Sequence, residues 1–185
     1  MADRGLFWSP APDWQRADIR CRDLTVTTRS AAAAWLVSGA LARFLEDREE
    51  MRCHGPLDVC DPDAYALRLA PDRLLLVALG GGTANLPAFG WSDDGVAVTD
   101  VSDAFVLFDV AGRGALDLMR LGADYQFDAA PVGSAESAMM VFAGVKAIVA
   151  RMPQGWRLHV ERPYAPALWR WLQHAASAWD KPPAA

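Results

Sequence analysis

The side chains that most often carry out catalysis are few in this chain and lie far apart in it. The only histidines are His54, His159 and His174. His159 lies in a strand-like alternation and His174 lies late in a predicted helix. We therefore interpret each as a surface or hydrogen-bonded structural histidine rather than a general base. Ser134 and Ser137 lack the strand–turn–helix context and flanking glycines of a nucleophile elbow. The sequence predicts no catalytic residue.

The cysteines and one histidine raise the question of a metal. Cys53, His54 and Cys60 are close in sequence, but six residues separate the two cysteines and no second pair follows. Because a closed structural zinc site normally takes four ligands, we predict free thiols and no metal. With Cys21 the count is three, an odd number that favours reduced thiols and a cytoplasmic location over a disulfide framework.

A glycine run and an acidic cluster are the remaining candidates for ligand binding. Gly80–Gly82 follows a predicted strand, as phosphate-binding loops do, but neither Lys-Ser nor Lys-Thr follows it and no dinucleotide fingerprint is present. We interpret it as a flexible connector. Asp93, Asp94, Asp100 and Asp103 fit a polar turn and a strand start. The sequence predicts no cofactor-binding residue in this chain.

Composition limits the class of protein. The chain has 185 residues, of which 52% are hydrophobic and 22% charged, so we expect a true core. Its net charge of −5 disfavours nucleic-acid binding. No apolar run approaches eighteen residues, and the first ten residues contain an early acid, so we expect neither a membrane span nor a secretory signal.

Eight tryptophans are more than one small core easily buries, and tryptophan is enriched at protein interfaces. This abundance favours a subunit of a larger assembly. The candidate partner-interface residues are Phe7, Trp8 and Trp14 in an N-terminal arm, and Trp169 in the last helix. The arm would pack either on its own domain or on a partner chain. Trp169 lies one step off the predicted apolar stripe, so it would pack under a loop or anchor in a partner pocket.

The hydrophobic pattern of the first half predicts a strand, a helix and a hairpin. Leu24, Val26 and Thr28 alternate with polar residues, which indicates a half-buried strand. An alanine-rich run capped by Ser30 predicts a helix to Glu46. A loop over 51–63 leads to a hairpin over 65–79, which turns at Pro71 and Asp72.

The second half follows the same order. It predicts a strand over 105–110, a helix over 112–122, and strands over 135–142 and 145–151. A turn at Pro153 leads to a strand over 156–160. Pro166 begins a last helix, whose predicted apolar stripe contains Leu168, Trp171, Leu172, Ala175 and Trp179.

Two pairs of landmarks suggest an internal duplication. The predicted helix starts at Ser30 and Gly112, and the hairpin turns at Pro71 and Pro153, are both 82 residues apart. The predicted fold is α+β, with two duplicated strand–helix–strand–strand halves. We expect an N-terminal arm over 1–19, the first half over 20–79, a linker over 80–95, the second half over 96–178 and a tail over 179–185.

Motifs in the second half share their order and spacing with one known family. VTDVSD at 98–103 leads to FVL at 105–107, VAG at 110–112 and ALDLM at 115–119. This run resembles the "D-[VL]-S … V-x-G-x-x-A-x-x-[LV]-L" run of the gamma subunit of heterotetrameric sarcosine oxidase. The wider glycine-cleavage T-protein (aminomethyltransferase) superfamily has a related run.

Further segments extend the resemblance from about residue 23 to residue 176. The segment 122–124 and APVG at 130–133 stand where the family has a Gly-, Asp- and Leu-containing loop and "F-P-x-G". LHVERPY at 158–164 and LWRWL at 168–172 are similar to the family ending, and RLAPDRLLL at 68–76 is similar to its hairpin. Arg73-Leu74 and Pro163 depart from the family pattern, and residues 1–19 are not clearly matched. These departures fit a divergent relative that serves another N-methylated amine.

The resemblance implies a structural subunit with an aminomethyltransferase-like, folate-related fold. In the family, flavin, NAD and tetrahydrofolate sit on the alpha and beta subunits, and a small delta subunit carries zinc. This chain would then be a non-catalytic partner of alpha, beta and delta subunits in oxidative demethylation of sarcosine. Two alternatives stay open, a stand-alone folate-binding or aminomethyltransferase-like protein and an unrelated interaction module. The "K-G-C-Y-x-G-Q" segment of folate-dependent tRNA-modifying relatives is absent from the sequence.

Overall fold

The computed structural model describes residues 11–31, 33–46, 52–79, 90–93, 95–131 and 136–180. They form two six-stranded sheets, here called sheet A and sheet B. In spatial order, sheet A contains β1 (Asp18–Arg20), β2 (Thr25–Arg29), β9 (Phe105–Ala111), β12 (Gly155–Glu161), β11 (Val145–Met152) and β10 (Met139–Phe142). Sheet B contains β7 (Gly90–Trp91), β8 (Val96–Asp100), β3 (Ala33–Gly39), β6 (Arg73–Ala78), β5 (Ala64–Ala70) and β4 (Cys53–His54).

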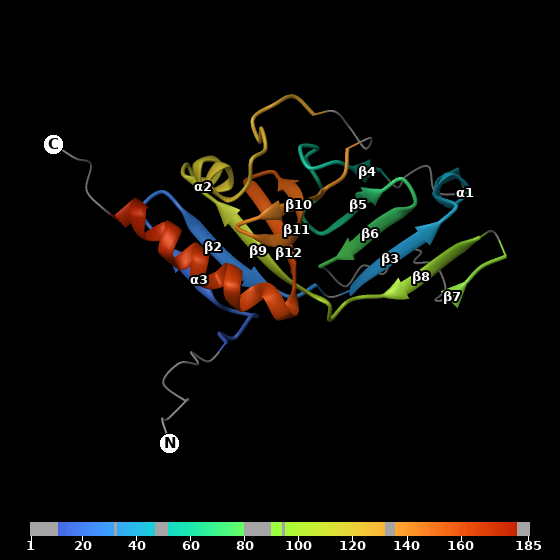
Figure 1. The fold of residues 1–185 in the computed structure, drawn as a ribbon, viewed down its shortest axis with the longest axis horizontal. Helices are drawn as coiled ribbons and strands as arrows, with labels where there is room; N and C mark the ends of the chain where they lie inside the picture. Colours follow the sequence, from blue (N-terminus) through green and yellow to red (C-terminus); the bar gives the residue numbers. More distant parts are fainter. Residues whose placement is uncertain are drawn as a thin grey trace, which may run out of the picture.

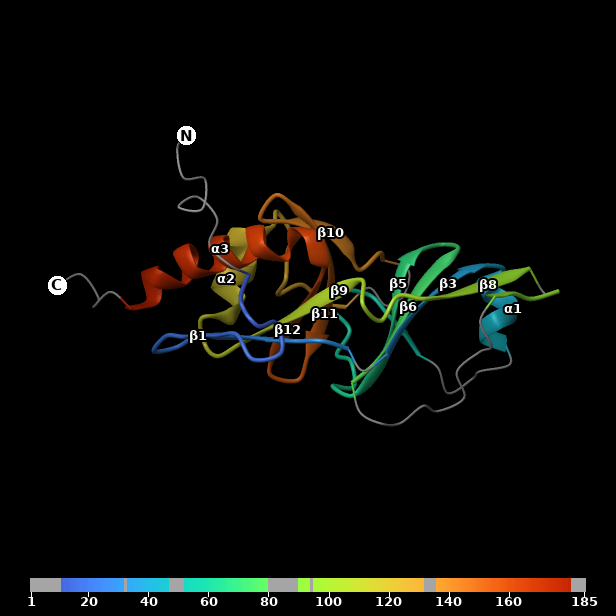
Figure 2. The same cartoon turned by 90° about the horizontal axis from the view of Figure 1, so that it is seen from below.

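The helices complete the two layers. Helices α2 (Ala115–Gly122) and α3 (Ala165–Ala176) lie beside sheet A at one end of an elongated molecule, and the short α1 (Leu41–Glu46) lies at the sheet B end (Figures 1 and 2). Two 3-10 turns, Arg162–Tyr164 and Ser177–Asp180, flank α3. The α+β fold class predicted from the sequence is confirmed.

The two halves repeat the same order of elements. In one, β3, α1, β5 and β6 follow each other; in the other, β9, α2, β11 and β12 do. The two sheets also have matching strand orders, because β8, β3, β6 and β5 of sheet B correspond to β2, β9, β12 and β11 of sheet A. A strand–helix–strand–strand unit is therefore present twice in the described residues, but its first copy begins with Ala33–Gly39 and not with the strand predicted around Leu24–Thr28.

Each half gives one strand to the sheet of the other half. β2 precedes β3 in sequence but pairs with β9, and β8 precedes β9 but pairs with β3. The chain thus crosses from sheet A to sheet B before β3 and returns after β8 (Figure 1). The predicted linker at residues 80–95 does not separate the two sheets in sequence. β2 precedes it but belongs to sheet A, whose β9 to β12 follow it, and β8 follows it but belongs to sheet B, whose β3 to β6 precede it. Residues 80–89 of the predicted linker lie outside the described residues, as do residues 181–185 of the tail.

The predicted helix from Ser30 to Glu46 is wrong over most of its length. Ala33–Gly39 is a strand in the middle of sheet B, hydrogen-bonded to both β6 and β8, and only Leu41–Glu46 is helical. The alanine-rich composition favours a helix locally, but pairing on both edges of the strand outweighs that small preference. Because no helix begins at Ser30, the 82-residue offset between the two predicted helix starts is also wrong. Both hairpins turn at Pro71 and Pro153 as predicted.

Two glycines mark equivalent positions in the repeat. Gly39 at the end of β3 and Gly112 just after β9 have φ of 116° and 103°. A Cβ atom on Gly39 would collide with the carbonyl of Gly95, which precedes β8, and one on Gly112 would collide with the carbonyl of Asp23, which precedes β2. Because only glycine tolerates this conformation and this approach, both residues fix where the exchanged strand begins.

Three apolar clusters hold the layers together. One lies between sheet A and the helices α2 and α3, and includes Phe108, Leu118, Phe127 and Leu168. A second joins the facing sides of the two sheets through residues of β5, β6 and β11. The third covers the other face of sheet B, where α1 packs. The second cluster therefore surrounds the polar groups considered next.

Candidate functional site

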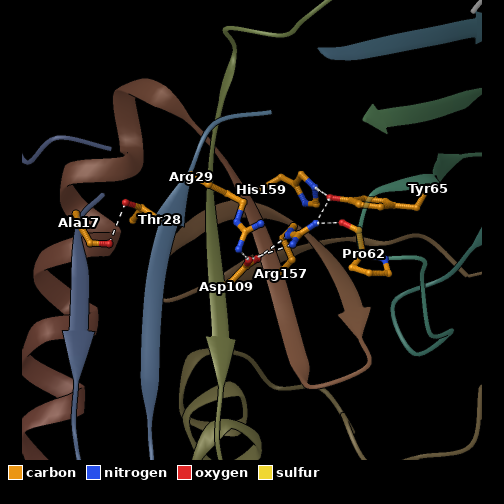
Figure 3. Close-up of polar contacts among 8 residues, drawn as sticks. All are labelled: Ala17, Thr28, Arg29, Pro62, Tyr65, Asp109, Arg157 and His159. Carbon is orange, nitrogen blue, oxygen red and sulfur yellow. Dashed lines mark hydrogen bonds and ion pairs between the residues drawn. The ribbon is translucent and has the colours of Figure 1, made fainter. Parts of the chain in front are cut away.

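A buried polar cluster joins the two sheets. We call it the junction cluster: Tyr65, Asp109, Arg157 and His159, with Arg29 at its edge (Figure 3). The register of sheet A sets Asp109 on β9 directly opposite Arg157 on β12. Because strand residues two apart face the same side, His159 lies on the side of Arg157 and faces sheet B. Tyr65 on β5 meets it there.

His159 is completely surrounded, with 1% of its surface exposed. Its Nδ1 lies 3.0 Å from the carbonyl oxygen of Ile148, which only accepts, so Nδ1 carries the proton. Nε2 is then an acceptor, and the hydroxyl of Tyr65 donates to it across 2.7 Å. Burial, with the nearby charge of Arg157, lowers the pKa of His159 to about 4. His159 is therefore buried and hydrogen-bonded through both ring nitrogens.

Arg157 is the central charge of the cluster, and its side chain is 3% exposed. Its Nε and Nη2 donate to the two carboxylate oxygens of Asp109, and its Nη1 donates to the carbonyl of Pro62 across 3.0 Å. The same Nη1 lies 3.4 Å from the hydroxyl of Tyr65. A bidentate guanidinium–carboxylate pair of this kind fixes the orientation of both side chains and compensates their charges. Arg157 thereby ties β12 and β9 to the loop before β5.

The junction cluster is built to hold two sheets in register. Its phenol, imidazole and guanidinium all face each other or backbone carbonyls, and burial raises the pKa of the Tyr65 hydroxyl. A neutral imidazole with only 1% of its surface exposed is out of reach of a substrate in solution. The arrangement therefore links the two sheets through buried hydrogen bonds and an ion pair.

The cysteines and His54 do not form a metal centre in the described part of the chain. Cys53 and His54 form the two-residue edge strand β4, and Cys60 lies buried near β11. Burial, reinforced by Asp58, raises the pKa of the Cys60 thiol to about 12. Among the described residues, no three histidine, cysteine or acidic side chains gather in a way that suits a metal ion. Cys53 and Cys60 are free thiols.

The predicted partner-interface residues separate into two groups. Phe7 and Trp8 lie outside the described residues. Trp14 and Trp169 meet edge to face, with ring centroids 6.2 Å apart, and both pack on Phe108. Trp14 therefore packs on its own chain, which was one of the two alternatives for this part of the arm.

The placement of Trp169 off the buried stripe of the last helix is wrong. Leu168, Trp169 and Leu172 are buried, whereas Trp171 is only half-buried. Trp169 keeps 7% of its surface exposed because Trp14 and Phe108 cover it from two sides. The apolar face of α3 is thus rotated toward Trp169. An interface role for this residue stays a prediction, and only 7% of its surface is exposed for contact with a partner.

Other apolar side chains are exposed at the sheet edges. Trp91 on β7 is 76% exposed, and Val141 on β10 is 63% exposed. Sequence reasoning did not single them out, because each lies in an edge strand of four residues or fewer. A tryptophan two residues before an Asp-Asp-Gly turn was the available signal for Trp91.

A model of the sarcosine oxidase gamma subunit family matches residues 59–178, well over half of the chain. The chain belongs to this family. The matched residues include the junction side chains Tyr65, Asp109, Arg157 and His159, and all of α2 and α3. The resemblance drawn from the motifs is confirmed.

One solved structure has a fold similar to that of this chain. One chain of the heterotetrameric sarcosine oxidase from Corynebacterium sp. U-96, in complex with pyrrole 2-carboxylate, aligns with a TM-score of 0.61 and 18% identity. The alignment covers 87% of this chain and 88% of that chain. Curated proteins gave no match. Of the helices in the described residues, none is long and apolar enough to cross a membrane.

Proposed function

We propose that this chain is a structural, non-catalytic subunit of a heterotetrameric sarcosine oxidase-type complex. The observation that carries the proposal is its membership of the gamma-subunit family over residues 59–178. The shared fold with one chain of a heterotetrameric sarcosine oxidase supports it, because that likeness extends over most of both chains. The reaction of the complex would be oxidative demethylation of sarcosine or a related N-methyl amine.

The polar groups of this chain support a structural role. In the junction cluster, the side chains with suitable chemistry are buried and bonded to one another. Flavin, NAD and tetrahydrofolate would therefore reside on companion alpha and beta subunits, with delta as the fourth chain. The free thiols Cys53 and Cys60 support a cytoplasmic location for the complex.

Assembly and activity test the proposal together. We expect the tagged full-length chain, produced with its genomic neighbours, to copurify with a yellow flavin-bearing chain and to oxidise sarcosine only in that complex. The purified chain alone should be colourless and inactive. Tight binding of tetrahydrofolate by the isolated chain, or turnover of a methylated amine by it, would overturn the proposal in favour of an aminomethyltransferase-like protein.

The N-terminal arm offers a second, more local test. Replacing Phe7 and Trp8 together with Ala should weaken retention of the flavin-bearing chain and leave the melting temperature of the isolated chain unchanged. The reason is that aromatic anchors contribute strongly to binding when they are buried at an interface. Equal retention by the double variant and the native chain would remove the arm from the interface.

A further inference from the structure

An open hollow of about 490 Å³ lies beside the junction cluster, between β1, β2 and the end of β6. Its wall contains three arginines, Arg16 before β1, Arg20 on β1 and Arg29 at the end of β2, against one acid, Asp18. Thr27 and Ser30, which both carry hydroxyl groups, also line the hollow. The hollow has the size of a small-molecule site, and its lining is cationic in a chain whose net charge is −5.

The hollow is continuous with the junction cluster through one sheet face. Thr27 pairs with Asp18 on one side and with Asp109 on the other, so these three residues form a row across β1, β2 and β9. Arg157 extends the row on β12. The inner end of the row is covered by sheet B, whereas its outer end at β1 and β2 is open. Arg29 lies at the transition, with 47% of its side chain exposed.

Charge counting around this row leaves one guanidinium in excess. Arg16 pairs with Asp13 at 2.9 Å, and Arg20 pairs with Asp18 at 2.5 Å. Arg29 and Arg157 share the single carboxylate of Asp109, with Arg29 Nη2 2.8 Å from Oδ2 (Figure 3). The single negative charge of Asp109 cannot neutralise the two guanidinium groups of Arg29 and Arg157. His159 and Tyr65, the next groups inward, are neutral in this arrangement.

Arg29 is the residue whose uncompensated positive charge can bind an anion. A guanidinium carries five N–H donors in a planar fork, which suits carboxylate and phosphate oxygens. Among the described residues, Asp109 is the one carboxylate with which Arg29 forms an ion pair, and it does so through Nη2. The low-dielectric junction on the inner side strengthens the attraction of this charge for an anion from the solvent side.

We propose that this hollow binds one small anionic group, a carboxylate or a phosphate, with Arg29 as its main partner. Arg16 and Arg20 close the cationic wall, and Thr27 and Ser30 supply hydroxyl donors. The site rests on the geometry of this chain alone, so it stands or falls independently of the proposed function.

The test uses the full-length chain and two probes, inorganic phosphate and succinate. The arginine Nε–Hε resonances are followed by NMR at constant ionic strength, with chloride as the matched salt. We expect a saturable shift of the Arg29 resonance. Arg29→Gln should weaken the binding at least tenfold. Arg113→Gln is the matched control, because Arg113 is an exposed arginine paired with Asp23 outside the hollow, and its loss should leave the affinity within twofold.

Two results would overturn the proposal: shifts no larger than those with chloride, or equal affinity in the Arg29→Gln and Arg113→Gln variants. If Arg29→Gln does not fold, Arg20→Gln decides, because this 77% exposed side chain is not needed for folding and its loss should still weaken binding several-fold. The companion-bearing complex then identifies the source of the anion. Loss of phosphate binding on assembly would assign the group to an acidic side chain of a companion subunit, and retention would assign it to a free small acid.

Discussion

Tyr65 donates a hydrogen bond to Nε2 of His159 across 2.7 Å, and this contact links sheet B to sheet A. The two residues are 94 positions apart and come from β5 of one half and β12 of the other. Their rings also meet edge to face, with centroids 5.7 Å apart. Because the two sheets are hydrogen-bonded separately, substitution of either residue removes this contact between them.

Removing the Tyr65 hydroxyl should weaken the folded state. In Tyr65→Phe, Nε2 of His159 stays buried without its donor, at a cost of about 1–3 kcal/mol in the free energy of unfolding. Urea unfolding followed by tryptophan fluorescence measures this cost. Tyr164→Phe is the control, since that side chain is 50% exposed and its change should cost almost nothing. Equal midpoints for the two variants would contradict the proposed role of the contact.

The Arg157–Asp109 pair should show strong coupling. Asp109→Asn removes the charge that compensates Arg157, a 3% exposed cation, and should cost about 3 kcal/mol or more. The double variant Asp109→Asn/Arg157→Met should be more stable than the sum of the two single changes predicts, because it leaves no buried charge uncompensated. Asp117→Asn, which affects only a surface pair with Arg120, should cost less than about 1 kcal/mol. Simple additivity in the double-mutant cycle would refute the coupling.

Acid should destabilise the protein through His159 before most carboxylates titrate. The pKa of this imidazole is lowered in the folded state to about 4, whereas an unfolded histidine titrates near about 6.5. Between these values the unfolded state binds more protons, so stability is complete above about pH 6.5 and falls as the pH drops toward about 4. The expected loss is on the order of 1–3 kcal/mol.

Chemical unfolding at several pH values between 4.5 and 7 checks this dependence. His159→Gln should flatten the curve in that interval, because it removes the titrating group. His174→Gln should not, since His174 is exposed on α3. A native-like slope in the His159→Gln variant would show that another group controls the acid response.

We expect Trp169 to contribute mainly to the stability of its own chain rather than to subunit assembly. Trp169→Ala removes a buried ring that packs on Trp14 and Phe108, and it should cost about 3–5 kcal/mol. Trp91→Ala is the matched control, because that ring is 76% exposed and its removal should leave the unfolding midpoint unchanged. A normal midpoint in Trp169→Ala, combined with weaker subunit assembly, would restore Trp169 as an interface residue.

Local patterns located the hairpins but not the partners of the strands. The turns at Pro71 and Pro153 carry their own turn chemistry, so both hairpins were predictable. Ala33–Gly39 was not, because alanine-rich segments score as helix until long-range pairing is known. Nor does any local signal say that β2 pairs with β9 rather than β3.

The junction cluster too was predictable only in part from local sequence. Arg157 and His159 are polar residues on one face of a strand whose opposite face, Trp156, Leu158 and Val160, is apolar, and that pattern indicates a buried polar partner. The identity of the partners, Tyr65 and Asp109, depends on contacts between strands that lie far apart in sequence. Sequence spacing could therefore suggest the polar face but not complete the site.

The exchange of β2 and β8 has a consequence for how this chain can be divided. A fragment ending before β8 would leave an edge of β3 unpaired, and a fragment beginning after β2 would do the same to β9. Bare edges of central strands recruit other chains and aggregate. The two copies of the ancestral unit have thus become mutually dependent: the duplication can be read in the fold, but neither copy can be cut out and kept soluble.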